Sequence, residues 1–115
     1  LIDAFENILI NGIYHNDNQE VRLWVEISTI LTDGAKKLKI EFKDNGVGIP
    51  NERKTRIFKR AKHDRKKKKG MGIGLSLVKK IIKSYGGQIW VEDRIKGEYE
   101  QGSNFNVLLQ NKDIK

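Results

Sequence analysis

Apolar residues recur at helical spacing in the first part of the chain. They stand at Leu1, Ile2, Phe5, Leu9 and Ile13. Because a helix turns by about 100° per residue, this spacing predicts one helix over residues 1–16 whose apolar stripe is buried.

Three polar residues of the same segment are spaced four apart: Asn7, Asn11 and His15. Side chains four apart lie on one face of a helix, so these three form a second stripe that borders the apolar one. We expect the two amides and the imidazole to lie over a cleft. From the pattern alone, the alternative that the asparagines are solvated and that His15 is simply packed stays open.

Alternating apolar and polar residues predict a pair of strands at 21–31 and 36–43. Asp33-Gly34 between them is typical of a tight hairpin turn. The apolar residues of both strands share one face, which we expect to cover helices.

The second half of the chain predicts a helix followed by another strand pair. The helix runs over residues 72–85 and ends at Gly86-Gly87, since glycine adopts the left-handed conformation that closes many helices. The strands lie at 88–93 and 103–110, with Trp90 and Phe105 in the core. A short helix is expected at about 51–59.

These elements predict an α+β fold in one domain, residues 1–115. In this two-layer sandwich a mixed sheet carries about three helices on one face. The chain has no cysteine and therefore no disulfide framework. It has no apolar run of about 18 residues, so we expect a cytoplasmic domain without membrane contact of its own.

The formal net charge of +8 is concentrated in one segment. Residues 53–69 hold 11 of the 23 Lys and Arg and a single acid, Asp64. A basic face spread over a whole domain would suit a nucleic-acid backbone. A basic segment between two glycine-rich turns instead suits a polyphosphate or a docking partner, and a merely solvated charge run stays open for the individual lysines.

The two glycine-rich turns carry the candidate chemistry. The first, residues 44–50, follows a strand, so the carboxylate of Asp44 should point into a pocket while Gly46 and Gly48 allow close backbone approach. The second turn places Gly70, Gly72 and Gly74 at a helix start, where free N–H groups favour phosphate.

In this order, the two turns resemble the glycine boxes of the ATP-binding catalytic domain of sensor histidine kinases. That superfamily, with the Bergerat ATP-binding fold, includes DNA gyrase, the ninety-kilodalton heat-shock chaperone and mismatch-repair ATPases. The resemblance implies an asparagine box at 7–15, a first glycine box at 44–50, an ATP lid at 59–69 and a second glycine box at 70–75. Ile57-Phe58 resembles the family's phenylalanine box.

The resemblance implies a role for each matching residue. Asn11 would be the ligand of Mg²⁺ and Asn7 its support, and these two are the expected catalytic residues. Asp44 would accept a hydrogen bond from the adenine amine. The full set expected at ATP is Asn7, Asn11, His15, Asp44, Gly46, Gly48, Ile49, Arg65, Lys69, Gly70, Gly72, Gly74, Leu75 and Asn104.

The family transfers the γ-phosphoryl group of Mg-ATP to a histidine on a separate dimerisation domain, which this chain does not contain. We therefore expect that domain as the partner, a response regulator as an indirect partner, and no phosphotransfer by the chain alone. Two alternatives remain. One is an ATP-hydrolysing or switch-type relative, although Glu6 points about 100° away from the Asn7 position. The other is a nucleic-acid-binding module, although the basic run lacks interleaved aromatics.

The basic segment generates the first prediction. Replacing Lys66, Lys67, Lys68 and Lys69 by Ser should weaken ATP more than ADP, because charge-assisted contacts to the γ-phosphate are lost. Nucleotide titrations at several salt concentrations should also show a flatter salt dependence. Equal losses for ATP and ADP would mean that the run is only a solvated or docking surface.

Overall fold

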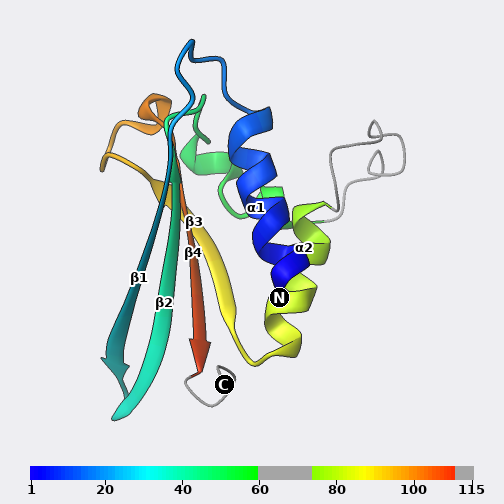
Figure 1. The fold of residues 1–115 in the computed structure, drawn as a ribbon, viewed down its shortest axis with the longest axis vertical. Coiled ribbons are helices and arrows are strands. Elements are labelled where there is room, and N and C mark those ends of the chain that lie inside the picture. The colour runs from blue at the N-terminus through cyan, green and yellow to red at the C-terminus, as the bar shows by residue number, and fades with distance from the viewer. Residues whose placement is uncertain (60–73, 111–115) are drawn as a thin grey trace.

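The computed structural model describes residues 1–59 and 74–110. The elements in chain order are α1 (Ile2–Tyr14), β1 (Leu23–Thr32), β2 (Ala35–Asp44), the 3-10 turns η1 (Asn51–Arg53) and η2 (Arg56–Phe58), α2 (Leu75–Ser84), β3 (Gln88–Asp93), η4 (Tyr99–Gln101) and β4 (Ser103–Gln110). The helices lie on one face of a single sheet (Figure 1). The predicted α+β sandwich is therefore confirmed.

The sheet has the strand order β1-β2-β4-β3. Each of these pairs is antiparallel, so the expectation of a mixed sheet is wrong for the described residues. The sheet has no parallel pair because β4 lies between β2 and β3. Strands β2 and β3 run in the same direction, but each is hydrogen-bonded to β4 and not to the other.

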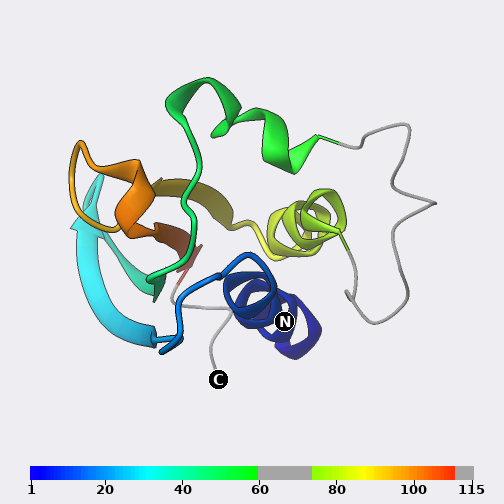
Figure 2. The ribbon, with the colours of Figure 1, turned by 90° about the horizontal axis from the view of Figure 1, so that it is seen from above.

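The helical layer covers only part of the sheet. Figure 2 shows α1 and α2 side by side over it, with the η1–η2 segment beside α2. Strand β1 forms one edge of the sheet, and Val25 and Ile27 on it are 49% and 65% exposed. The expectation that both strands of the first hairpin cover helices therefore holds for β2 but not for most of β1.

The first hairpin turns at the expected residues. Asp33 and Gly34 have φ of 50° and 77°, and Thr32 pairs with Ala35 across the turn. Positive φ at both central residues defines the turn type that matches the twist of the flanking strands. This local prediction is confirmed.

Helix α1 forms as predicted but buries a different stripe. Its buried residues are Ala4, Ile8 and Gly12, whereas Ile2 and Ile13 are 75% and 53% exposed. The predicted stripe is therefore wrong at its two ends. Small residues at 4 and 12 let the helix approach its neighbours closely, which rotates the buried face toward Ile8.

Helix α2 ends with the predicted glycine cap. The N–H of Gly86 donates to Lys83 O and that of Gly87 to Ile82 O, and Gly86 has φ of 73°. These two bonds satisfy carbonyls at the helix end. The two strands that follow have the predicted bounds.

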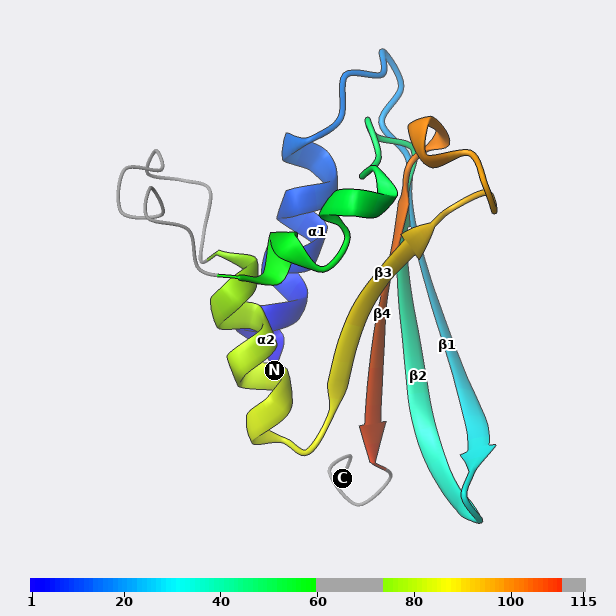
Figure 3. The same cartoon turned by 180° about the vertical axis from the view of Figure 1, so that it is seen from behind.

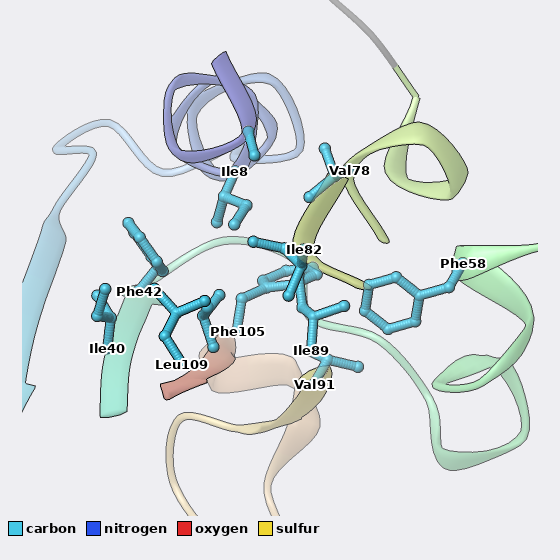
Figure 4. Close-up of a cluster of buried hydrophobic side chains, with 12 residues drawn as sticks. Ile8, Ile40, Phe42, Phe58, Val78, Ile82, Ile89, Val91, Phe105 and Leu109 are labelled. Atoms are coloured by element: carbon cyan, nitrogen blue, oxygen red, sulfur yellow. The ribbon is translucent and has the colours of Figure 1, made fainter. Parts of the chain in front are cut away.

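The core lies between the helices and β2, β4 and β3 (Figure 4). Ile8 from α1 and Val78 and Ile82 from α2 meet Phe105 at its centre. The ring of Phe58 stands edge-on to that of Phe105, with centroids 6.1 Å apart. Phe105 is in the predicted core, but Trp90 is only partly buried and donates to Glu92 Oε2 on the face of the sheet away from the helices.

Substitutions at two isoleucines of α1 test which face of this helix is buried. Ile8→Ala should lower the free energy of unfolding by about 2–5 kcal/mol, because it opens a cavity beside Phe105. Ile13→Ala is the matched control on the same helix and should cost about 1 kcal/mol or less. Urea denaturation of both variants measures this, and equal losses would contradict the buried face seen here.

Candidate functional site

The site is built around the carboxylate of Asp44, the last residue of β2. Asp44 is 6% exposed, and its Oδ1 accepts hydrogen bonds from the N–H of Gly46 (2.9 Å) and of Ser103 (3.2 Å). Burial raises the pKa of Asp44 above its ordinary value, although these two bonds and the charges of Arg94 and His15 act the other way. No hydrogen bond from the described residues reaches its Oδ2. That oxygen can therefore accept a hydrogen bond from a ligand N–H.

Helix α1 approaches this carboxylate through Gly12. A Cβ on Gly12 would stand 3.1 Å from Leu23 Cδ2 and 3.4 Å from Asp44 Oδ2. A larger side chain would therefore push the helix away or fill the space beside the free oxygen. Gly12 thus belongs to the site, and its signal is the small residue that follows Asn11.

The glycines of the first turn serve packing within the protein. A Cβ on Gly46 would lie 2.5 Å from His15 O, and one on Gly48, which has φ of 76°, would lie 1.7 Å from Tyr99 O. The turn is thus pressed between the end of α1 and η4. The role predicted for these glycines toward a base stays a prediction, as does that of the partly buried Ile49 beside them.

Asn45 holds the same turn to the loop that joins α1 and β1. Its Oδ1 accepts from Asn16 Nδ2 (2.8 Å) and from the N–H of Arg22 (2.9 Å), and its Nδ2 donates to Glu20 O (2.9 Å). Asn18 Nδ2 donates to the Asn45 carbonyl. Sequence reasoning missed this residue, because the partners of an Asn in a tight turn have no signature of their own.

The asparagine stripe lies on one side of the buried face of α1. The opposite side bears Phe5, whose ring is 5.5 Å from that of Phe42 on β2. Asn7 is partly buried, and its Nδ2 donates to Asp3 O (2.7 Å). Asn11 is also partly buried, and its side chain makes no hydrogen bond to the described residues. His15 follows the helix, exposed but close enough for its charge to act on Asp44.

Only the end of the second glycine turn lies within the described residues. Gly74 precedes α2 in extended conformation, no side chain caps the helix start, and Leu75 packs partly against the core. The predicted ATP residues Arg65, Lys69, Gly70 and Gly72, and the lid from residue 60 on, lie outside the described residues.

Asn104 lies apart from this group, and its predicted place at ATP stays a prediction. It pairs with Lys43, so its side chain lies on the face away from Phe105, and its Nδ2 donates to Glu41 Oε1 (2.9 Å). Ser103 is the residue of β4 that reaches Asp44. The signal was present, because strand alternation puts residue 103, not 104, on the face of the core residue Phe105.

The described residues hold no group of three or more His, Cys, Asp or Glu placed to bind a metal. Within the same ranges, no helix is long and apolar enough to cross a bilayer.

Comparison with known proteins agrees with this geometry. The family described as histidine kinase-, DNA gyrase B-, and HSP90-like ATPase matches residues 1–113. Cyanobacterial phytochrome B of Nostoc sp. is 37% identical over 111 residues, which are 94% of this chain and 14% of that protein. Adaptive-response sensory kinase SasA of Gloeothece citriformis is 39% identical over 106 residues, which are 90% of this chain and 25% of that protein. The nucleotide-free catalytic domain of histidine kinase ThkA matches with a TM-score of 0.70 and 28% identity, covering 93% of this chain and 64% of that one.

The chain therefore belongs to the histidine kinase-, DNA gyrase B-, and HSP90-like ATPase family. Within that family it is an ATP-binding catalytic domain of the sensor histidine kinase type. It spans about a quarter or less of the length of the two curated relatives.

The buried carboxylate generates a prediction about stability and pH. Its pKa is raised in the folded state, so the protonated form favours folding, and that contribution is lost as pH rises above the unfolded value of about 3.9. Asp44→Asn resembles the protonated form and keeps an oxygen for Gly46 and Ser103. The variant's free energy of unfolding, relative to wild type, should therefore increase from pH 4 to pH 7 in urea denaturation. A difference that ignores pH would contradict the burial penalty.

Proposed function

We propose that this domain binds Mg-ATP and presents the γ-phosphoryl group to a histidine on a separate dimerisation domain of its parent kinase. The observation that carries the proposal is Asp44, a buried carboxylate with one oxygen held by the backbone and the other free beside Gly12. Such an oxygen selects a ligand N–H, because a ligand without one would leave the buried group unpaired. The exocyclic amine of adenine supplies that N–H.

Asn11 would hold the metal at the other end of the nucleotide. Its partly buried amide makes no hydrogen bond to the described residues and lies next to Gly12 on α1. An amide oxygen is a hard, neutral ligand, so it leaves the charge of the cation for the phosphates. Bound Mg²⁺ would supply charge neutralisation there. Asn7, already held by Asp3 O, supports this side of the helix.

For phosphoryl transfer, the domain mainly has to position the γ-phosphoryl group for the acceptor histidine. The acceptor imidazole is itself the nucleophile: its nitrogen forms the bond to the γ-phosphorus while the bond to the bridging oxygen breaks and ADP leaves. Asp44 orients the base, and the open start of α2 at Gly74 offers N–H groups to phosphate. A response regulator would act downstream of the phosphorylated histidine. We also propose that the domain acts in the cytoplasm as part of its parent kinase.

The hydrolytic alternative finds no support at the expected position. A base that activates water would have to lie near Asn7, and the neighbouring Glu6 is exposed on α1. Glu6 therefore also serves as a control position on the same helix.

Two substitutions test the proposal with ATP analogue titrations and phosphotransfer assays. Asp44→Asn should lower adenine nucleotide affinity at least about a hundredfold, because its amide offers a donor where the adenine amine needs an acceptor. Asn11→Ala should keep nucleotide binding without Mg²⁺ but lose transfer to the added dimerisation domain.

Glu6→Gln is the matched control and should leave both measurements unchanged. Unchanged affinity of Asp44→Asn would refute the pocket assignment. Normal transfer by Asn11→Ala would refute the metal role.

A further inference from the structure

Lys54, between η1 and η2, makes three polar contacts at the edge of the site, and its side chain is largely buried. Its ammonium nitrogen lies 2.9 Å from Ile49 O, 2.6 Å from Asn51 Oδ1 and 2.8 Å from Asp93 Oδ1. The side chains of Lys54 and Asp93 are only 16% and 14% exposed. The ammonium donates hydrogen bonds to Ile49 O and Asn51 Oδ1, and its contact with Asp93 Oδ1 is an ion pair.

The ion pair with Lys54 compensates the burial of the Asp93 carboxylate. Asp93 Oδ1 is buried and has no other partner among the described residues. Removing the ammonium would leave a carboxylate oxygen out of water without compensation. This alone would make Lys54 a stabilising residue, and stability alone could be met by two apolar side chains of similar size.

The three contacts also connect two segments that build the site. Ile49 belongs to the glycine turn that starts at Asp44. Asp93 ends β3 and pairs with Ser103, whose N–H donates to Asp44 Oδ1. Lys54 therefore ties the turn after Asp44 to the strand ends that hold the Asp44 carboxylate. Figure 3 shows the η1–η2 segment beside the upper end of β3.

We propose that Lys54 is a positioning residue for nucleotide binding, which acts without touching the nucleotide. It sets the distance between the glycine turn and the ends of β3 and β4, and thereby the position of a base that binds the free oxygen of Asp44. The inference rests on the proposed function, because it presumes that the base lies against Asp44 and this turn.

The test separates positioning from stability. Lys54→Met should lower the melting temperature and weaken ATP binding. In Lys54→Met/Asp93→Leu the buried charge is gone from both sides, so the melting temperature should recover. The contact to Ile49 O is still missing, however, and affinity should stay at least about tenfold below wild type. Lys36→Met, at the far hairpin, is the matched control and should change neither quantity.

A third variant keeps the test decisive if the apolar pair folds poorly. Lys54→Arg retains the charge beside Asp93, but a planar guanidinium cannot meet three oxygens arranged around one nitrogen. It should fold and bind ATP more weakly than wild type. Calorimetric titrations are made well below the melting temperature of each variant.

The outcomes distinguish the two proposals. Wild-type affinity in Lys54→Arg, or in the double variant once its melting temperature has recovered, would overturn the positioning role. A wild-type domain that binds no Mg-ATP would instead overturn the proposed function.

Discussion

Satisfying the buried carboxylate of Asp44 is the constraint on which the rest of the site depends. A carboxylate removed from water requires donors nearby, and here the backbone of Gly46 and of Ser103 supplies them. The turn after β2 must therefore fold back on itself, and β4 must begin beside it. Gly102 allows this approach, since a Cβ there would stand 1.9 Å from Asp44 O. One acid thus determines how the strand ends and α1 converge.

The segments that meet at Asp44 are also held together by close backbone packing at glycines. Gly12, Gly46 and Gly48 each stand where a Cβ would contact a neighbouring segment. Asn45 and Lys54 then fasten the glycine turn from two sides, toward the loop after α1 and toward β3. The site end of the sheet is therefore polar and tightly linked. Toward its far end the first hairpin carries the exposed apolar residues Ile27 and Leu31.

Much of the fold followed from the sequence because its signals are local. The Asp33-Gly34 turn, the Gly86-Gly87 cap and the bounds of β3 and β4 each depend on residues a few positions apart, and all are confirmed. The position of Asp44 at a strand end was predictable for the same reason. Strand alternation likewise places Ser103, and not Asn104, on the same face of β4 as Phe105.

The sequence by itself determined the two α-helices, the four strands, the glycine turns and the identity of the buried acid, but not the two 3-10 turns at 51–58. The tertiary structure alone decided which face of α1 is buried, that β4 lies between β2 and β3, and which oxygens surround Lys54. The periodicity of apolar residues indicates that a helix or strand has an apolar face, but it does not say which other element packs against that face. Asp93 stands far along the chain from Lys54, and no local pattern links them. Such pairings arise only when the sheet and helices pack, because burial then makes each unpaired charge costly.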